Sequence, residues 1–150
     1  MTRALDLLCV ALTGSILLAA CATASREAAF RKEEVELFRA RHEASIACET
    51  TVACDKAWAR TRTFIQTHSA TRVVQADSSA IQTAFPHAFG FVYLAATRSA
   101  DEAGHIVIRL KAMCRGMYAS DGGAGPLYST CARSIESAEA EFHAWVQEDR

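Results

Sequence analysis

The sequence predicts a small α+β domain in which helices pack on one face of an antiparallel sheet of three or four strands. Two long segments have the apolar spacing of amphipathic helices, and several short segments between them alternate as β-strands do. Four cysteines accompany these segments and predict a disulfide-stabilised fold. With 150 residues the chain has room for one domain with a real core.

Three helices are expected. Residues 26–46 contain no Gly or Pro and are rich in good helix formers, but their apolar face is thin. Residues 22–47 therefore either pack on the domain or form a helical stalk. A second helix is expected over 50–67, with a threonine N-cap and a continuous apolar face. The third is expected over 130–147.

Strands are expected between the second and third helices, over residues 71–76, 80–85, 88–97 and 105–113. The last of these alternates most clearly, with aliphatic residues at even positions and polar or charged residues at several odd ones. The aliphatic side is expected to face the helices and the charged side to face outward. A glycine-rich loop over 115–130 connects this strand to the last helix.

The beginning of the chain has the layout of a secretory signal. Residues 1–20 have a basic start and a short uncharged apolar run that ends in small residues. The run ends in Leu18-Ala19-Ala20-Cys21, which resembles the lipobox of bacterial lipoprotein precursors. The resemblance covers residues 1–21 only.

That resemblance implies that Cys21 is acylated, that residues 1–20 are removed, and that residues 21–150 form a single periplasmic domain held to a membrane by lipid. The residue after Cys21 is Ala22. In enterobacterial lipoproteins an Asp at this position retains the protein in the inner membrane, so the match favours the outer membrane, facing the periplasm. Two alternatives remain open. One is ordinary signal-peptide cleavage, because residues 22–24 are also small, and the other is an uncleaved anchor.

The cysteines divide by role. Of the six, one lies in the expected signal peptide and Cys21 is the expected acylation site. The remaining four are Cys48, Cys54, Cys114 and Cys131. They allow three disulfide pairings, of which the local one, Cys48–Cys54 with Cys114–Cys131, is favoured. Their spacing does not match the Cys-x₂₋₄-Cys pattern of zinc sites, so no metal site is predicted.

No catalytic constellation is visible, and the chain is predicted not to be an enzyme. The five histidines form no metal-binding pair, and neither a Gly-x-Ser-x-Gly nor a phosphate-binding loop motif occurs. A pair of carboxylates that meets only in the folded protein remains open. No cofactor is predicted. The net charge of −1 provides no general attraction to nucleic acid.

The residues predicted to contact a partner are basic and aromatic and lie near the end of the last strand. They are Arg109, Lys111, Arg115, Tyr118 and Tyr128. Such residues are typical of surfaces that recognise a protein, a glycan or a peptide. The alternative is a solvated strand face with loop tyrosines packed on the core.

The predicted function is that of a membrane-anchored envelope lipoprotein, a non-enzymatic binding or structural module whose partner is another envelope protein. A periplasmic inhibitor or immunity-type protein is the second hypothesis. In that case the 115–130 loop inserts into an enzyme or toxin.

Overall fold

The computed structural model describes residues 24–147. The expected signal peptide and the acylation site at Cys21 lie outside the described residues. The chain divides into two compact units, Met1–Val35 and Glu36–Arg150. A helix covers residues 24–43 and so crosses this division. Its part in the first unit carries an exposed ion pair between Arg31 and Glu27, at 3.9 Å.

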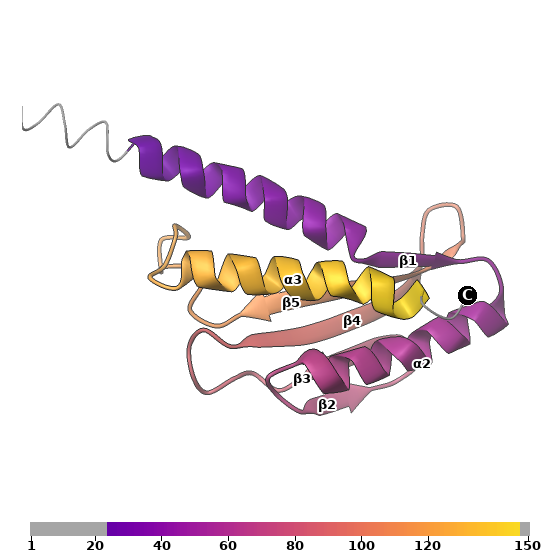
Figure 1. The fold of residues 1–150 in the computed structure, drawn as a ribbon. Helices are drawn as coiled ribbons and strands as arrows, with labels where there is room; N and C mark the ends of the chain where they lie inside the picture. Colours follow the sequence, from indigo (N-terminus) through magenta and orange to yellow (C-terminus); the bar gives the residue numbers. More distant parts are fainter. Residues whose placement is uncertain (1–23, 148–150) are drawn as a thin grey trace, which may run out of the picture. The chain divides into compact units, whose positions relative to one another are not determined.

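The second unit contains a five-stranded antiparallel sheet with the order β1-β5-β4-β3-β2 (Figure 1). The strands are β1 (Ser45–Cys48), β2 (Val73–Ala76), β3 (Ala80–Thr83), β4 (Val92–Ala100) and β5 (Ile106–Cys114). The central pair, β4 and β5, is a long hairpin. The predicted α+β class with an antiparallel sheet is confirmed, with one strand more than expected.

The additional strand is β1, which sequence patterning assigned to the end of the first helix. That helix stops at residue 43, and Ser45–Cys48 pairs with β5 instead. The pairing places Ile46 opposite Ile108, and both side chains are buried. A contact with a strand some 60 positions later therefore overrides the local helix propensity of this segment.

Two helices, α2 (Thr51–His68) and α3 (Tyr128–Gln147), pack on the same face of the sheet (Figure 1). Helix α2 begins at the N-cap Thr50, whose Oγ1 accepts a hydrogen bond from the N–H of Ala53 at 3.2 Å. Phe64 of α2 and Phe142 of α3 meet edge to face, with ring centroids 5.4 Å apart, and both are fully buried. The predicted packing of helices on one face is confirmed.

From Ile108 to Ala112 the side chains of β5 alternate as expected, although Val107, on the same face as Arg109, is also buried. Ile108, Leu110 and Ala112 are buried beneath the helices, whereas Arg109 and Lys111 are exposed on the opposite face. We call this opposite face of the sheet the open face. It carries the outward residues of β4 and β5, and neither α2 nor α3 covers it.

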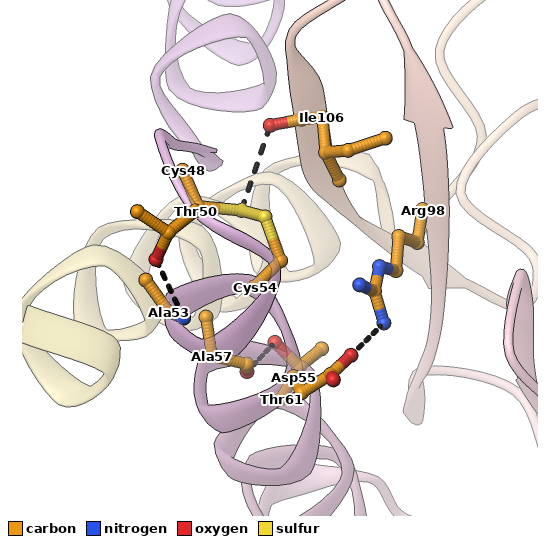
Figure 2. The surroundings of a disulfide bond; sticks show 9 residues. All are labelled: Cys48, Thr50, Ala53, Cys54, Asp55, Ala57, Thr61, Arg98 and Ile106. Atoms are coloured by element: carbon orange, nitrogen blue, oxygen red, sulfur yellow. Dashed lines mark hydrogen bonds and ion pairs between the residues drawn. A yellow bond between two sulfur atoms is a disulfide. The ribbon is translucent and has the colours of Figure 1, made fainter.

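Two disulfides join sheet to helix, in the pairing that the sequence spacing favoured. Cys48–Cys54 connects the end of β1 to the first turn of α2 (Figure 2). Beside it, Arg98 of β4 forms an ion pair with Asp55 of α2 at 2.8 Å (Figure 2). The second disulfide, Cys114–Cys131, connects the last residue of β5 to the first turn of α3.

Candidate protein-binding surface

Arg115, directly after β5, is the centre of an exposed group of aromatic side chains. Its Nη1 donates hydrogen bonds to the backbone oxygens of Pro86, at 2.8 Å, and of His87. Its guanidinium carbon lies 5.1 Å from the ring centroid of Phe85 and 4.6 Å from that of Phe89. The guanidinium therefore connects two rings of the 84–91 loop through cation–π contacts and ties that loop to β5.

The ring of Tyr93, on β4, packs edge to face on Phe85, with centroids 5.4 Å apart. We call Phe85, Phe89, Tyr93 and Arg115 the aromatic cluster. Its members come from β4, from the loop before β4 and from the end of β5. Since each ring contacts another member of the cluster, the rings are ordered before any partner arrives.

The backbone beneath the cluster is also fixed. The N–H of Gly90 donates to the carbonyl oxygen of Arg115 at 2.9 Å. Cys114, one residue before Arg115, is bonded to Cys131 in the first turn of α3. Gly116 has φ of +79°, and a Cβ there would lie 2.5 Å from Cδ1 of Phe89. Gly116 is thus required both for the turn and for the approach of the ring.

The rings of the cluster are exposed to an unusual degree. Phe85 is 60% exposed and Phe89 is 63% exposed. Exposing more than half of two large apolar rings forgoes part of the free energy of burying them, which is about 1.5–3 kcal/mol for a fully buried side chain. Grouped and rigid aromatic residues with an arginine among them are typical of the central contacts of protein interfaces.

The cluster continues onto the open face of the sheet. Tyr93 lies directly opposite Met113 of β5, and Lys111 and Arg109 follow along the same strand opposite Ala95 and Thr97. Partners directly opposite each other in an antiparallel pair point to the same face. Three of the five predicted contact residues, Arg109, Lys111 and Arg115, therefore form one continuous surface with aromatic residues that the prediction did not include.

The two predicted tyrosines lie elsewhere and differ from one another. Tyr118 is 48% exposed and its ring packs edge to face on Tyr128. Tyr128 is only 3% exposed because it begins α3 and enters the core. Tyr128 is therefore buried and lies outside the exposed surface, where its ring packs against that of Tyr118.

Sequence reasoning missed Phe85 and Phe89 because it assigned most of this segment to strands. β3 ends at Thr83 and β4 begins at Val92, so residues 84–91 form a loop rather than parts of the expected strands 80–85 and 88–97. Pro86 and Gly90 are the turn signals that mark this loop. The position of Phe85 and Phe89 next to Pro86 and Gly90 is the sequence feature that favours a loop with exposed rings over two strands.

The loop that follows the cluster, residues 116–127, is internally bonded. The N–H of Gly125 donates to the oxygen of Met117 at 2.8 Å, and the N–H of Ala119 donates to Gly123 at 2.9 Å. An isolated bridge pairs Tyr118 with Ala124. Although it is rich in glycine, the loop therefore has a defined shape, and it presents Tyr118 at its surface.

A buried acid that the sequence did not single out lies on the other side of the sheet. Glu139 of α3 is 1% exposed, and its Oε1 accepts the N–H of Ala112 at 3.1 Å. The Nε of Arg41 lies 3.6 Å from the same oxygen. Burial raises the pKa of the Glu139 carboxyl, and the bond from Ala112 and the charge of Arg41 oppose that rise. Glu139 is also one of the residues that line a cavity of about 570 Å³, together with His42 and His143.

The Glu139 side chain has no exposed surface, and its Oε1 already accepts the N–H of Ala112. We assign Glu139 a structural role, which is to accept the N–H of Ala112 at the edge of β5. Within residues 24–147, no group of three metal-binding side chains is arranged to hold an ion.

Comparison with protein-family models, with curated proteins and with solved structures found no match to this chain. Among the helices that the structure describes, none is both long enough and apolar enough to cross a bilayer.

Proposed function

We propose that this chain is a lipid-anchored protein of the bacterial envelope that binds another envelope protein through the aromatic cluster and has no enzymatic activity. The observation that carries the proposal is the pair of exposed, ordered rings of Phe85 and Phe89, which both contact the guanidinium of Arg115. Rings that are fixed before binding lose little side-chain entropy on association, which favours their use as contact residues.

The anchor is proposed from the lipobox-like sequence that ends at Cys21. Two or three acyl chains on this residue would hold the domain at the membrane almost permanently, since each buried CH₂ contributes about 0.8 kcal/mol. Ala22 after the cysteine supports the outer membrane, with the domain facing the periplasm. The two disulfides suit that compartment, because it is oxidising.

The binding function is tested in cells with a photo-reactive phenylalanine analogue at position 91, an exposed residue beside the cluster. We expect a discrete crosslinked product whose yield falls at least severalfold in Phe89→Ala. The matched control is Phe38→Ala, because Phe38 is equally large and exposed but lies on a separate element. Unchanged crosslinking in Phe89→Ala, or an equal loss in Phe38→Ala, would contradict the proposed surface.

The anchor is tested by lipid labelling. Cys21→Ala should abolish incorporation of radioactive palmitate and release the protein from membranes, whereas Cys9→Ala, which changes the other cysteine near the N-terminus, should leave both unaffected. Labelling that persists in Cys21→Ala would contradict the lipoprotein assignment. The proposed binding surface does not depend on this result and is tested separately by crosslinking.

The second candidate function is that of an inhibitor or immunity-type protein that blocks an enzyme or toxin. The shape of the 116–127 loop favours it, because a bonded loop that presents Tyr118 can enter a cleft with little loss of entropy. Crosslinking from Tyr118 to a single stoichiometric enzyme, with inhibition that Tyr118→Ala relieves, would support this function over the first.

A further inference from the structure

The open face of the sheet has a one-sided distribution of charge. None of the five strands contains an Asp or a Glu, whereas Arg109 and Lys111 project from this face and Arg115 follows at its end. The third cation within the strands is Arg98, which lies on the face that the helices cover and, unlike Arg109 and Lys111, has an acidic partner. It is paired with Asp55 of α2 at 2.8 Å.

No described carboxylate neutralises the two outward cations. Arg109 has only a hydroxyl partner, Ser99 Oγ at 3.4 Å, and neither it nor Lys111 takes part in an ion pair among residues 24–147. The tip of the β4–β5 hairpin carries two acids, Asp101 and Glu102. Asp101 is engaged locally, because its Oδ1 accepts the N–H groups of Ala103 and His105 at 2.9 and 2.8 Å. Glu102 is exposed and forms no ion pair with Arg109 or Lys111 among the described residues.

We propose that the open face binds an acidic segment of the partner protein, with carboxylates placed on Arg109 and Lys111 and an apolar side chain placed against the aromatic cluster. This inference rests on the proposed function and specifies the partner's chemistry. Alternate residues on one face of a strand are about 7 Å apart, so two carboxylates on alternate residues of an extended segment match the spacing of the two cations. Charge complementarity of this kind provides specificity and a faster encounter.

A protein segment fits this surface better than a membrane or a nucleic acid does. Attachment to anionic lipid is typical of clusters of about four to eight basic residues, and each contributes only about 1 kcal/mol. The open face and its end have three. The fixed rings of Phe85 and Phe89 beside them provide a contact for one defined side chain, which a fluid lipid surface does not present.

The test is an NMR titration of the full-length, isotope-labelled protein in micelles of a neutral detergent. The probe is the peptide acetyl-Leu-Thr-Glu-Thr-Glu-Thr-Leu-amide, and the comparison peptide has Gln at both Glu positions. We expect the Glu peptide to shift the amide signals of β5 and of the cluster, and to bind about tenfold more tightly than the Gln peptide at low salt. Equal affinity for the two peptides, or no shift on β5, would overturn the inference.

Charge reversal locates the site. Arg109→Glu with Lys111→Glu should abolish the preference for the Glu peptide. The control, Lys56→Glu with Arg62→Glu, makes the same change of charge at exposed positions of α2. This control variant should still prefer the Glu peptide to the Gln peptide. Vesicles of phosphatidylglycerol and phosphatidylethanolamine serve as the alternative ligand. Vesicle binding that depends on Arg109 and Lys111, without peptide binding, would assign the face to lipid and refute the acidic-segment proposal.

The crosslinking assay separates this inference from the function on which it rests. If the crosslink from position 91 still requires Phe89 but is insensitive to reversal of Arg109 and Lys111, the cluster binds a partner and the acidic-segment inference fails. If Phe89→Ala leaves the crosslink unchanged, the proposed function itself fails.

Discussion

The buried carboxyl of Glu139 allows a quantitative test of how α3 is held to the sheet. The hydrogen bonds between β1 and β5 end where the N–H of Leu110 donates to the carbonyl oxygen of Ala44. The next N–H of β5 that points toward this edge belongs to Ala112, and no strand residue accepts it. Glu139 Oε1 accepts it at 3.1 Å, and Arg41 approaches the same oxygen to 3.6 Å. A side chain on α3 thus completes an edge that the short β1 leaves open.

Glu139→Ala removes that acceptor and leaves a cavity. An unsatisfied buried N–H costs about 1–3 kcal/mol, and the loss of packed side-chain atoms adds to it. The Arg41 pair contributes little, because that guanidinium is half-exposed and screened. We expect a loss of about 2–4 kcal/mol in the free energy of unfolding, or about 1–2 M in the urea midpoint of the oxidised protein. Glu139→Gln keeps an acceptor of the same shape and should cost about 1 kcal/mol or less.

The pH dependence of stability provides the decisive comparison. Because burial raises the pKa of Glu139 in the folded state, the folded protein binds a proton here at a pH where the unfolded chain does not. This group therefore contributes more stability as the pH falls through its raised pKa toward the ordinary pKa of a glutamate, 4.5. In Glu139→Gln this contribution is absent, so the difference in unfolding free energy between wild type and Gln variant should move in favour of the wild type on acidification.

Urea unfolding followed by tryptophan fluorescence at several pH values measures this difference, and the other carboxyl groups cancel from it. A difference that stays constant from neutral pH to about 4.5, or that moves toward the Gln variant, would refute the assigned effect of burial. A Glu139→Ala variant as stable as Glu139→Gln would refute the role of the Ala112 hydrogen bond.

Three further predictions concern other parts of the domain. Replacing Cys114 and Cys131 by serine should lower the unfolding free energy by about 3 kcal/mol, measured by urea unfolding, because the bond closes a loop with a sequence separation of 17. Gly116→Ala should destabilise more than Gly122→Ala in the same assay. Both have positive φ, but a Cβ meets an aromatic ring of the cluster only at Gly116, and equal losses would argue against that contact. The pKa of Asp77 is lowered by a hydrogen bond from the Gln75 side chain of β2 and by further bonds from Ser79 and Ala80. The contribution of Asp77 to stability should therefore be present above the unfolded pKa near 4 and be lost as the pH falls, and Asp77→Asn should weaken that acid sensitivity in thermal melts.

Much of the fold was accessible from the sequence because it depends on local patterns. The apolar spacing of 51–68 and 128–147 marks helices whether or not their partners are known, and the alternation of β5 identifies which side chains face them. Local disulfide pairing follows from short separations. The positions of Arg109 and Lys111 on the open face were also predicted, because alternate residues of a strand point to the same face.

The parts that the sequence did not reveal depend on distant contacts. β1 is a strand only because β5 lies beside it, and its four residues have no strong pattern of their own. The aromatic cluster joins Arg115 to rings about 26 to 30 positions earlier, and no local rule links them. Glu139 resembles any acid of an amphipathic helix until the end of β1 leaves the Ala112 N–H without a partner.

The sequence by itself determined the types of the elements from α2 to α3, the face of the sheet that the helices cover and the cysteines available for disulfides, because each depends on the spacing of residues close together in the chain. The tertiary structure decided which exposed residues form one surface and which acid becomes buried. Those outcomes arise when segments far apart in the sequence are brought within a few ångströms, where hydrogen bonds, ring contacts and desolvation act.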